Sequence, residues 1–156
     1  MATGVKPIPD GYHAVTPLLV VNDAARAIEF YKSAFGAVER MRMAGPGGKI
    51  AHAEMTIGDS VIMLADEFPE WGDVGPKADG KSPVRIALYI DGVDEVARRA
   101  VAAGAKVLIP VADQFYGDRS GRLADPFGHL WIIATHKEDV SPGEMQKRME
   151  ALAKKS

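Results

Sequence analysis

The same order of patterns occurs twice along this chain, and this duplication constrains the fold more than any other feature. Each copy starts with a strand-like apolar stretch, continues with an amphipathic helical stretch that ends at a Gly-Ala pair, and finishes with three more strand-like stretches. The two pairs, Gly36-Ala37 and Gly104-Ala105, lie 68 residues apart. One βαβββ unit leaves an open sheet edge and an uncovered sheet face, so two units are expected to pair. The sequence therefore predicts an α+β fold built from two βαβββ modules.

The element boundaries follow from caps, turns and periodicity. We predict a single domain over 1–156, with a first module over 13–65, a linker loop over 66–82, a second module over 83–136 and a C-terminal helix within 137–156. Strands are expected at 15–21, 38–43, 50–57, 61–65, 84–90, 106–112, 120–124 and 129–135, and helices at 23–35 and 93–103. In the tail, Met145, Met149 and Leu152 form an apolar stripe that needs a covering surface, on this chain or on a partner subunit.

Composition excludes several classes of protein. The formal net charge of −2 and the pI of about 6.1 give no basic surface for nucleic acid. The longest apolar run, over 15–21, is too short to span a bilayer, so no membrane partner is expected. The chain has no cysteine, which excludes disulfides, thiolate catalysis and zinc-thiolate sites and suits a reducing cytoplasm.

Two strings of residues carry a family resemblance. The string TPLLVVNDAARAIEFYKSAFGA at 16–37, the string DPFGHLW at 125–131 and the duplicated βαβββ order together resemble the vicinal-oxygen-chelate superfamily, which comprises glyoxalases, bleomycin-resistance proteins and dioxygenases. The longer stretch over 113–142 looks like the PhnB-like branch. The resemblance covers nearly the whole chain and implies a curved mixed sheet around a cavity. It implies much less about activity, because members of this superfamily differ widely in chemistry.

Catalytic members of this superfamily place metal ligands at four strand positions. Carried over one at a time, these positions fall on Thr16, Glu54, Arg85 and Ile132. A divalent transition metal normally needs three or more nitrogen or oxygen donors, and a permanently charged guanidinium would repel it. Only Glu54 suits a metal, and it is also the one candidate catalytic residue. We therefore expect neither the family's metal nor another cofactor.

His52 leaves an alternative open. It shares a sheet face with Glu54 by the two-residue period of a strand, so a shifted metal site at His52 and Glu54 is conceivable. The competing interpretation is a histidine that makes ordinary polar contacts. His13, His129 and His136 fall at strand starts, turns or ends and are expected to have local roles.

Strand alternation sorts the predicted strands into two faces. One face is wholly apolar and is expected to lie under the helices: Leu19, Val21, Met55, Ile57, Ile86, Leu88, Ile90 and Ile133. The opposite face carries His52, Glu54, Arg85 and Tyr89 among apolar residues. We expect Glu54 and Arg85 to pair there. The pair either orients a polar or anionic ligand, with Tyr89, Trp131 or Phe115 as a flat contact, or serves as a structural ion pair.

The segment over 113–121 is a second candidate region. Phe115, Tyr116, Asp118 and Arg119 lie close together in a connection between strands, where they form either a pocket rim or a self-satisfied turn. The candidate ligand-binding residues are therefore His52, Glu54, Arg85, Tyr89, Phe115, Tyr116, Arg119 and Trp131.

Two functions remain open. The first is a homodimeric protein that binds or sequesters a small metabolite or antibiotic without the usual metal. The alternative is a glyoxalase- or dioxygenase-type lyase or isomerase with an atypical metal site at His52 and Glu54. The sequence favours the non-enzymatic function without deciding the matter.

Overall fold

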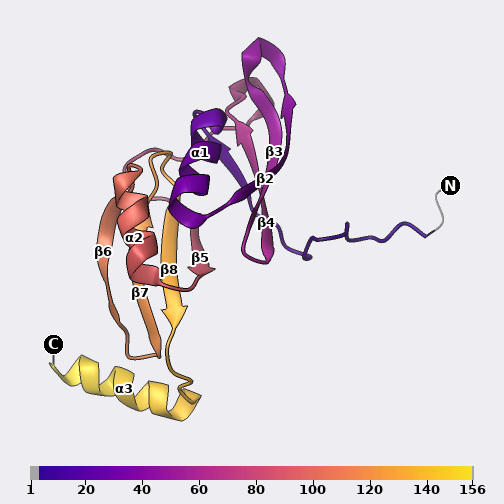
Figure 1. The fold of residues 1–156 in the computed structure, drawn as a ribbon. Helices are drawn as coiled ribbons and strands as arrows, with labels where there is room; N and C mark the ends of the chain where they lie inside the picture. Colours follow the sequence, from indigo (N-terminus) through magenta and orange to yellow (C-terminus); the bar gives the residue numbers. More distant parts are fainter. Residues whose placement is uncertain (1–3, 156) are drawn as a thin grey trace.

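The structure, a computed structural model, describes residues 4–155. Figure 1 shows two βαβββ modules followed by a separate helix. The first module comprises β1 (Leu18–Val21), α1 (Ala24–Phe35), β2 (Val38–Ala44), β3 (Ile50–Ile57) and β4 (Ser60–Asp66). The second module comprises β5 (Arg85–Tyr89), α2 (Val93–Ala102), β6 (Lys106–Asp113), β7 (Asp118–Ala124) and β8 (Leu130–His136). Helix α3 (Pro142–Lys155) follows. The predicted α+β architecture is confirmed.

Each module contains one four-stranded mixed sheet with the same topology. The strand orders are β1-β4-β3-β2 and β5-β8-β7-β6. In each sheet the first strand is parallel to the fourth, and the remaining pairs are antiparallel. The third strand of the first module has the predicted bounds, whereas β1 begins three residues later than expected. Pro17 explains the late start, because proline has no N–H to donate to a ladder; its carbonyl still accepts from the Met63 N–H.

Helix α1 forms because its ends and its apolar face agree. The Asp23 side chain accepts a hydrogen bond from the Arg26 N–H, and Gly36 ends the helix in the left-handed region at φ 68°. The buried face of the helix, which includes Ile28 and Tyr31, packs against the sheet of its own module. Helix α2 packs on the second sheet and beside α1 (Figure 1). Of the predicted apolar sheet face, residues such as Met55 and Ile133 lie in this core, whereas the β5 side (Ile86, Leu88 and Ile90) is partly buried and packs against it.

The string DPFGHLW joins the two modules through Asp125. This buried carboxylate accepts hydrogen bonds from the Tyr31 hydroxyl of α1 at 2.5 Å and from the Trp131 indole at 2.9 Å. It also accepts from the backbone N–H groups of Phe127 and His129. Gly128 has φ +93°, and a Cβ at this position would lie 2.8 Å from the carbonyl oxygen of Lys77 in the linker. The string therefore fixes a tight turn against α1 and the linker, which sets how the modules sit together.

Two segments lie outside the paired modules. The N-terminal segment extends away from the first module, and α3 lies beyond the far end of the second (Figure 1). Arg148 holds α3 through an ion pair to Glu138 and a hydrogen bond to the Phe115 carbonyl, and it also pairs with Glu144 one turn earlier in the same helix. The tail stripe is open, since Met149 and Leu152 are each 48% exposed. None of the helices in the described chain is long and apolar enough to cross a membrane.

Candidate functional site

The sheet face opposite α1 carries the first group of predicted site residues. Along β3 the buried Ala53, Met55 and Ile57 alternate with the half-buried His52, Glu54 and Thr56. Cross-strand partners on β2 add Met43 beside His52 and Met41 beside Glu54, and both methionines are substantially exposed. The shared face of His52 and Glu54, expected from the strand period, is confirmed. A carboxylate therefore lies on a sheet face that is otherwise mostly apolar.

Three side chains from different elements surround the Glu54 carboxylate. His52 Nε2 lies 3.0 Å from Glu54 Oε2, and Arg40 Nη1 lies 4.0 Å from Glu54 Oε1. Tyr12, from the segment before β1, donates its hydroxyl to the same carboxylate, and the Arg40 guanidinium lies 5.2 Å from the centre of the Tyr12 ring. The Tyr12 hydrogen bond, followed by the His52 hydrogen bond, lowers the pKa of Glu54 below its usual 4.5. Glu54 is thus held as a carboxylate by side chains of β2, β3 and the segment before β1.

The expected pair between Glu54 and Arg85 does not form. Arg85 lies at the start of β5 in the other module, opposite Leu130 of β8, and is exposed. Within residues 4–155 its guanidinium has no hydrogen bond or ion pair. The reason is that β3 and β5 belong to separate sheets, whose relative placement the strand period does not determine.

The four carried-over positions do not fit a divalent transition metal. Thr16 donates its hydroxyl to the His13 carbonyl at 3.5 Å, Arg85 is a cation and Ile132 is a hydrocarbon. Of the four, only Glu54 offers an anionic oxygen. Among the described residues, no group of three or more His, Cys, Asp or Glu side chains could surround a metal ion. The donor set at this site therefore cannot complete the coordination that the superfamily's catalytic members use.

The corresponding face of the second module carries a polar network at one end. The buried Asp118 accepts from the Tyr89 hydroxyl at 2.8 Å, and His136 Nδ1 lies 2.7 Å from its other oxygen. His136 Nε2 also lies 2.7 Å from Asp139, and hydrogen bonds to Asp118 and then Asp139 raise the pKa of His136 above 6.5. Tyr116 adds a 3.2 Å contact between its hydroxyl and Ser120 Oγ. Tyr89 and Tyr116 are thus positioned by polar partners on one face.

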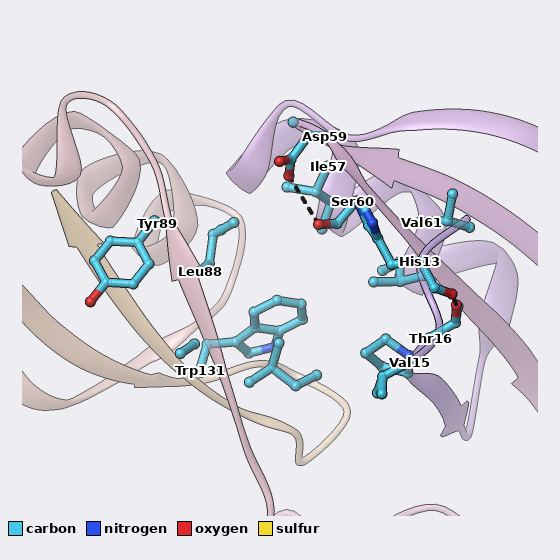
Figure 2. Close-up of a pocket in the computed structure, with 15 residues that line it drawn as sticks. His13, Val15, Thr16, Ile57, Asp59, Ser60, Val61, Leu88, Tyr89 and Trp131 are labelled. Atoms are coloured by element: carbon cyan, nitrogen blue, oxygen red, sulfur yellow. Dashed lines mark hydrogen bonds between the residues drawn. The ribbon is translucent and has the colours of Figure 1, made fainter. Parts of the chain in front are cut away.

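A cavity of about 580 Å³ lies between the modules. Figure 2 shows His13, Thr16 and Ser60 on one side and Leu88, Tyr89 and Trp131 on the other. The Tyr89 hydroxyl points away from the first module, towards its partner Asp118. A second hollow of about 710 Å³ lies between β1 and β5 and is lined by Arg85, Leu18 and the 74–76 segment, among others. The junction of the modules therefore offers space of the size that small ligands occupy.

The remaining predicted residues have different surroundings. Trp131 is 1% exposed, and its ring packs on Tyr31 and Phe35, so it belongs mainly to the core although it reaches the cavity wall. Arg119 bridges Asp94 of α2 and Asp113, away from Tyr116 and Tyr89. Phe115 packs edge-on against Tyr116. The structure thus brings Tyr89 and Tyr116 to one face, His52 and Glu54 to another, and leaves Arg119 apart from both.

Several polar residues of these faces had no signal in the sequence analysis. Tyr12 comes from an irregular segment, and its contact with Glu54 spans 42 residues. Arg40 sits at a register shift of β2, between the paired Glu39 and Met41, where simple alternation fails. By sequence, Asp118 belongs to a connection between strands and His136 to a strand end, yet their cross-strand register joins them.

Comparison with known proteins gives consistent matches. The model of the Glyoxalase/Bleomycin resistance protein/Dioxygenase superfamily matches residues 12–133. The uncharacterized protein Mb0911c of Mycobacterium bovis is 42% identical over 154 residues, which cover 97% of each chain. The crystal structure of TioX from Micromonospora sp. ML1 is 26% identical, with a TM-score of 0.61 over 79% of this chain and 99% of that one. The fosfomycin resistance protein FosX from Mesorhizobium loti, 20% identical, superposes with a TM-score of 0.59 over 90% and 97% of the two chains, which shows a shared fold alone.

Proposed function

The chain belongs to the Glyoxalase/Bleomycin resistance protein/Dioxygenase superfamily, and on that premise we propose that it binds a small molecule without the metal that catalytic members use. The observation that carries this proposal is the state of Glu54. Its two oxygens already face Tyr12, His52 and Arg40, and the three other ligand positions offer a hydroxyl, a guanidinium and an isoleucine. Cavities of about 580 and 710 Å³ at the junction of the modules supply room for a ligand.

The binding faces favour a ligand with both apolar and polar parts. The first face combines exposed Met41 and Met43 with the Glu54 cluster, and methionine adapts its shape to varied apolar partners. Sequestration of an antibiotic or a metabolite is the role that this combination supports. We also propose that the chain belongs to the PhnB-like branch, which the stretch over 113–142 resembles.

We propose that the working form is a homodimer. Apolar side chains are open on β2 (Val38, Met43), on β6 (Val107, Ile109) and on α3 (Met149, Leu152), each at 44% exposure or more. Open apolar surface of this extent is typical of an interface, and a second copy with two-fold symmetry would cover it on both subunits. Sedimentation velocity at tens of micromolar is expected to show a dimer, and Met149→Lys to weaken it. A clean monomer at that concentration contradicts the proposal.

Metal analysis and ligand screening together test the main proposal. Purified protein should contain no stoichiometric transition metal, and a thermal-shift screen should find stabilising small molecules equally well with and without a chelator. A bound ligand raises stability by RT ln(1 + [L]/Kd), so a hit should shift the midpoint in a concentration-dependent way.

One observation favours the alternative of an enzyme with an atypical metal site. His52 Nε2 and Glu54 Oε2 are 3.0 Å apart, so two potential donors already lie together. One equivalent of metal that is lost in Glu54→Gln, together with a catalytic activity, would establish this alternative and refute the metal-free proposal.

A further inference from the structure

The face of the second module carries two arginines without partners, and this follows from the sheet register. Across β5, β8, β7 and β6, one row of facing residues is Arg85, Leu130, Ala124 and Lys106; the next is Ala87, Ile132, Arg122 and Ile109; the third is Tyr89, Ala134, Ser120 and Ala112. These three rows contain three cations and no aspartate or glutamate. Asp118, the first acid beyond them, is occupied by Tyr89 and His136.

Arg122 is the stronger evidence for a ligand, because it is half-buried whereas Arg85 is exposed. It is half-buried on the central strand β7, yet within residues 4–155 its guanidinium makes no hydrogen bond, ion pair or ring contact. Three other arginines on the described chain are matched with carboxylates: Arg42 with Glu39, Arg119 with Asp94 and Asp113, and Arg148 with Glu138 and Glu144. A guanidinium in a half-buried place loses hydration, and that loss is normally offset by an anion.

A hollow of about 120 Å³ lies at Arg122 and is lined also by Gln114, Tyr116 and Ser120. Its volume corresponds to roughly four water molecules at about 30 Å³ each, which is the size of a head group rather than of a whole ligand. The Gln114 amide already donates to the Ala112 and Ser120 carbonyls, and the Tyr116 and Ser120 hydroxyls contact each other, so one of these two hydroxyls keeps a proton to donate. Ile109 and Ile132 form the apolar wall of the hollow. A planar guanidinium beside such a hydroxyl suits the oxygens of a carboxylate or another oxyanion.

From Arg122 an apolar path leads towards the junction of the modules. Ile132 lies directly beside it on β8, and Ala87 lies one strand further on β5. Ala87 lines both larger hollows at the module junction. Two strand spacings separate Arg122 from Ala87, about 10 Å. This length fits a flat or elongated apolar body, with Arg85 at the far side as a second positive charge.

We propose that the second module binds a small organic anion, with its oxyanion head on Arg122 and its apolar body along Ile132 and Ala87. This inference rests on the proposed function and specifies the ligand class. Ile132 stands at a carried-over metal position, so the apolar body occupies space that a metal centre takes in catalytic members.

A matched pair of probes tests the head group. The full chain is titrated calorimetrically with naphthalene-2-carboxylate and with the neutral naphthalene-2-carboxamide, which share one apolar body. We expect the carboxylate to bind about tenfold or more tightly than the amide and to weaken as ionic strength rises. Arg122→Met should reduce carboxylate affinity to that of the amide and leave amide affinity unchanged. Arg85→Met should give a smaller loss.

Arg99→Met is the control, because Arg99 is exposed on α2 and its loss changes the net charge equally. It should leave both affinities unchanged. If Arg122→Met does not fold, Arg122→Lys and Arg85→Met are titrated with the same two probes instead. Arg122→Lys keeps the positive charge but loses the planar guanidinium.

Equal affinity for the two probes, no binding of either, or an Arg122→Met protein with unaltered carboxylate affinity would each overturn the anion proposal. Small-molecule binding itself would still stand if the thermal-shift screen found neutral ligands. Loss of the dimer in Arg122→Met, measured by sedimentation, with unaltered carboxylate binding would assign the arginine to contact with a second copy instead.

Discussion

Replacing Tyr31 by Phe removes a single oxygen from the junction of the two modules. The Tyr31 hydroxyl donates to Asp125 at 2.5 Å, and burial, followed by the Asp125 charge, raises the pKa of that hydroxyl well above 10.0. Phenylalanine keeps the ring contacts with Phe35 and Trp131, whose centroids lie 6.0 and 5.4 Å away. The substitution therefore tests one hydrogen bond to a buried carboxylate with little change in packing.

The expected loss follows from the partners that remain. Asp125 keeps the Trp131 indole and two backbone N–H groups, so one of four donors disappears. A hydrogen bond to a charged group contributes about 1.5–3 kcal/mol, and Tyr31 is fully buried, so water does not replace the hydroxyl. We expect the free energy of unfolding to fall by about 2 kcal/mol. With an m-value near 2 kcal/mol/M, the urea midpoint should drop by roughly 1 M.

Urea unfolding followed by far-UV circular dichroism measures this loss. Tyr116→Phe is the matched control, because it removes the same atom from a neutral, half-buried contact with Ser120 and should cost less than about 1 kcal/mol. An unchanged m-value in both variants keeps the comparison valid. If Tyr31→Phe costs no more than Tyr116→Phe, Asp125 does not depend on Tyr31, and our account of the junction is refuted.

Three further predictions concern single groups. The His136 imidazole should titrate above pH 6.5 when followed by NMR, and Asp118→Asn should lower the pH of that titration midpoint. Because the pKa of His136 is raised in the folded state, the stabilisation that His136 contributes is complete below about pH 6.5 and is lost as pH rises through the raised pKa. Tyr12→Phe should raise the pKa of Glu54 towards 4.5, as followed by carboxyl-carbon NMR, since the Tyr12 hydrogen bond is the largest cause of its depression; an unchanged midpoint would refute that assignment. Gly128→Ala should lower the free energy of unfolding by about 1–3 kcal/mol, because φ is +93° and the added Cβ meets backbone; a neutral effect in thermal melts would contradict this.

The fold could be predicted from the sequence because its signals are local and repeated. The Asp23 cap, the glycine after Phe35 and the alternation along 50–57 each depend on neighbouring residues only. The same alternation placed His52 and Glu54 on one face. Where a local rule is broken, the observed element differs from the predicted one: at Pro17 the strand β1 is shorter than the sequence pattern indicates.

The partners of the site residues could not be predicted in the same way. Which side chain meets Glu54 depends on the path of the segment before β1 and on a register shift in β2, and these brought Tyr12 and Arg40 to it. The expected meeting with Arg85 depends on how one sheet is placed relative to the other, and no period within a single strand contains that information.

The hydrogen bond from His129 Nε2 to the Val20 carbonyl, 2.8 Å long, bears on how the protein avoids aggregation. Strand β1 is the outer strand of its sheet, and an open carbonyl row there would be a template for a strand from another chain. His129 occupies one of these carbonyls, and Gly75 packs so closely that a Cβ would lie 2.8 Å from the same oxygen. Addition of a foreign strand at β1 therefore requires the linker and the turn at His129 to move away first. The contacts that join the two modules thus also cover this edge of the sheet.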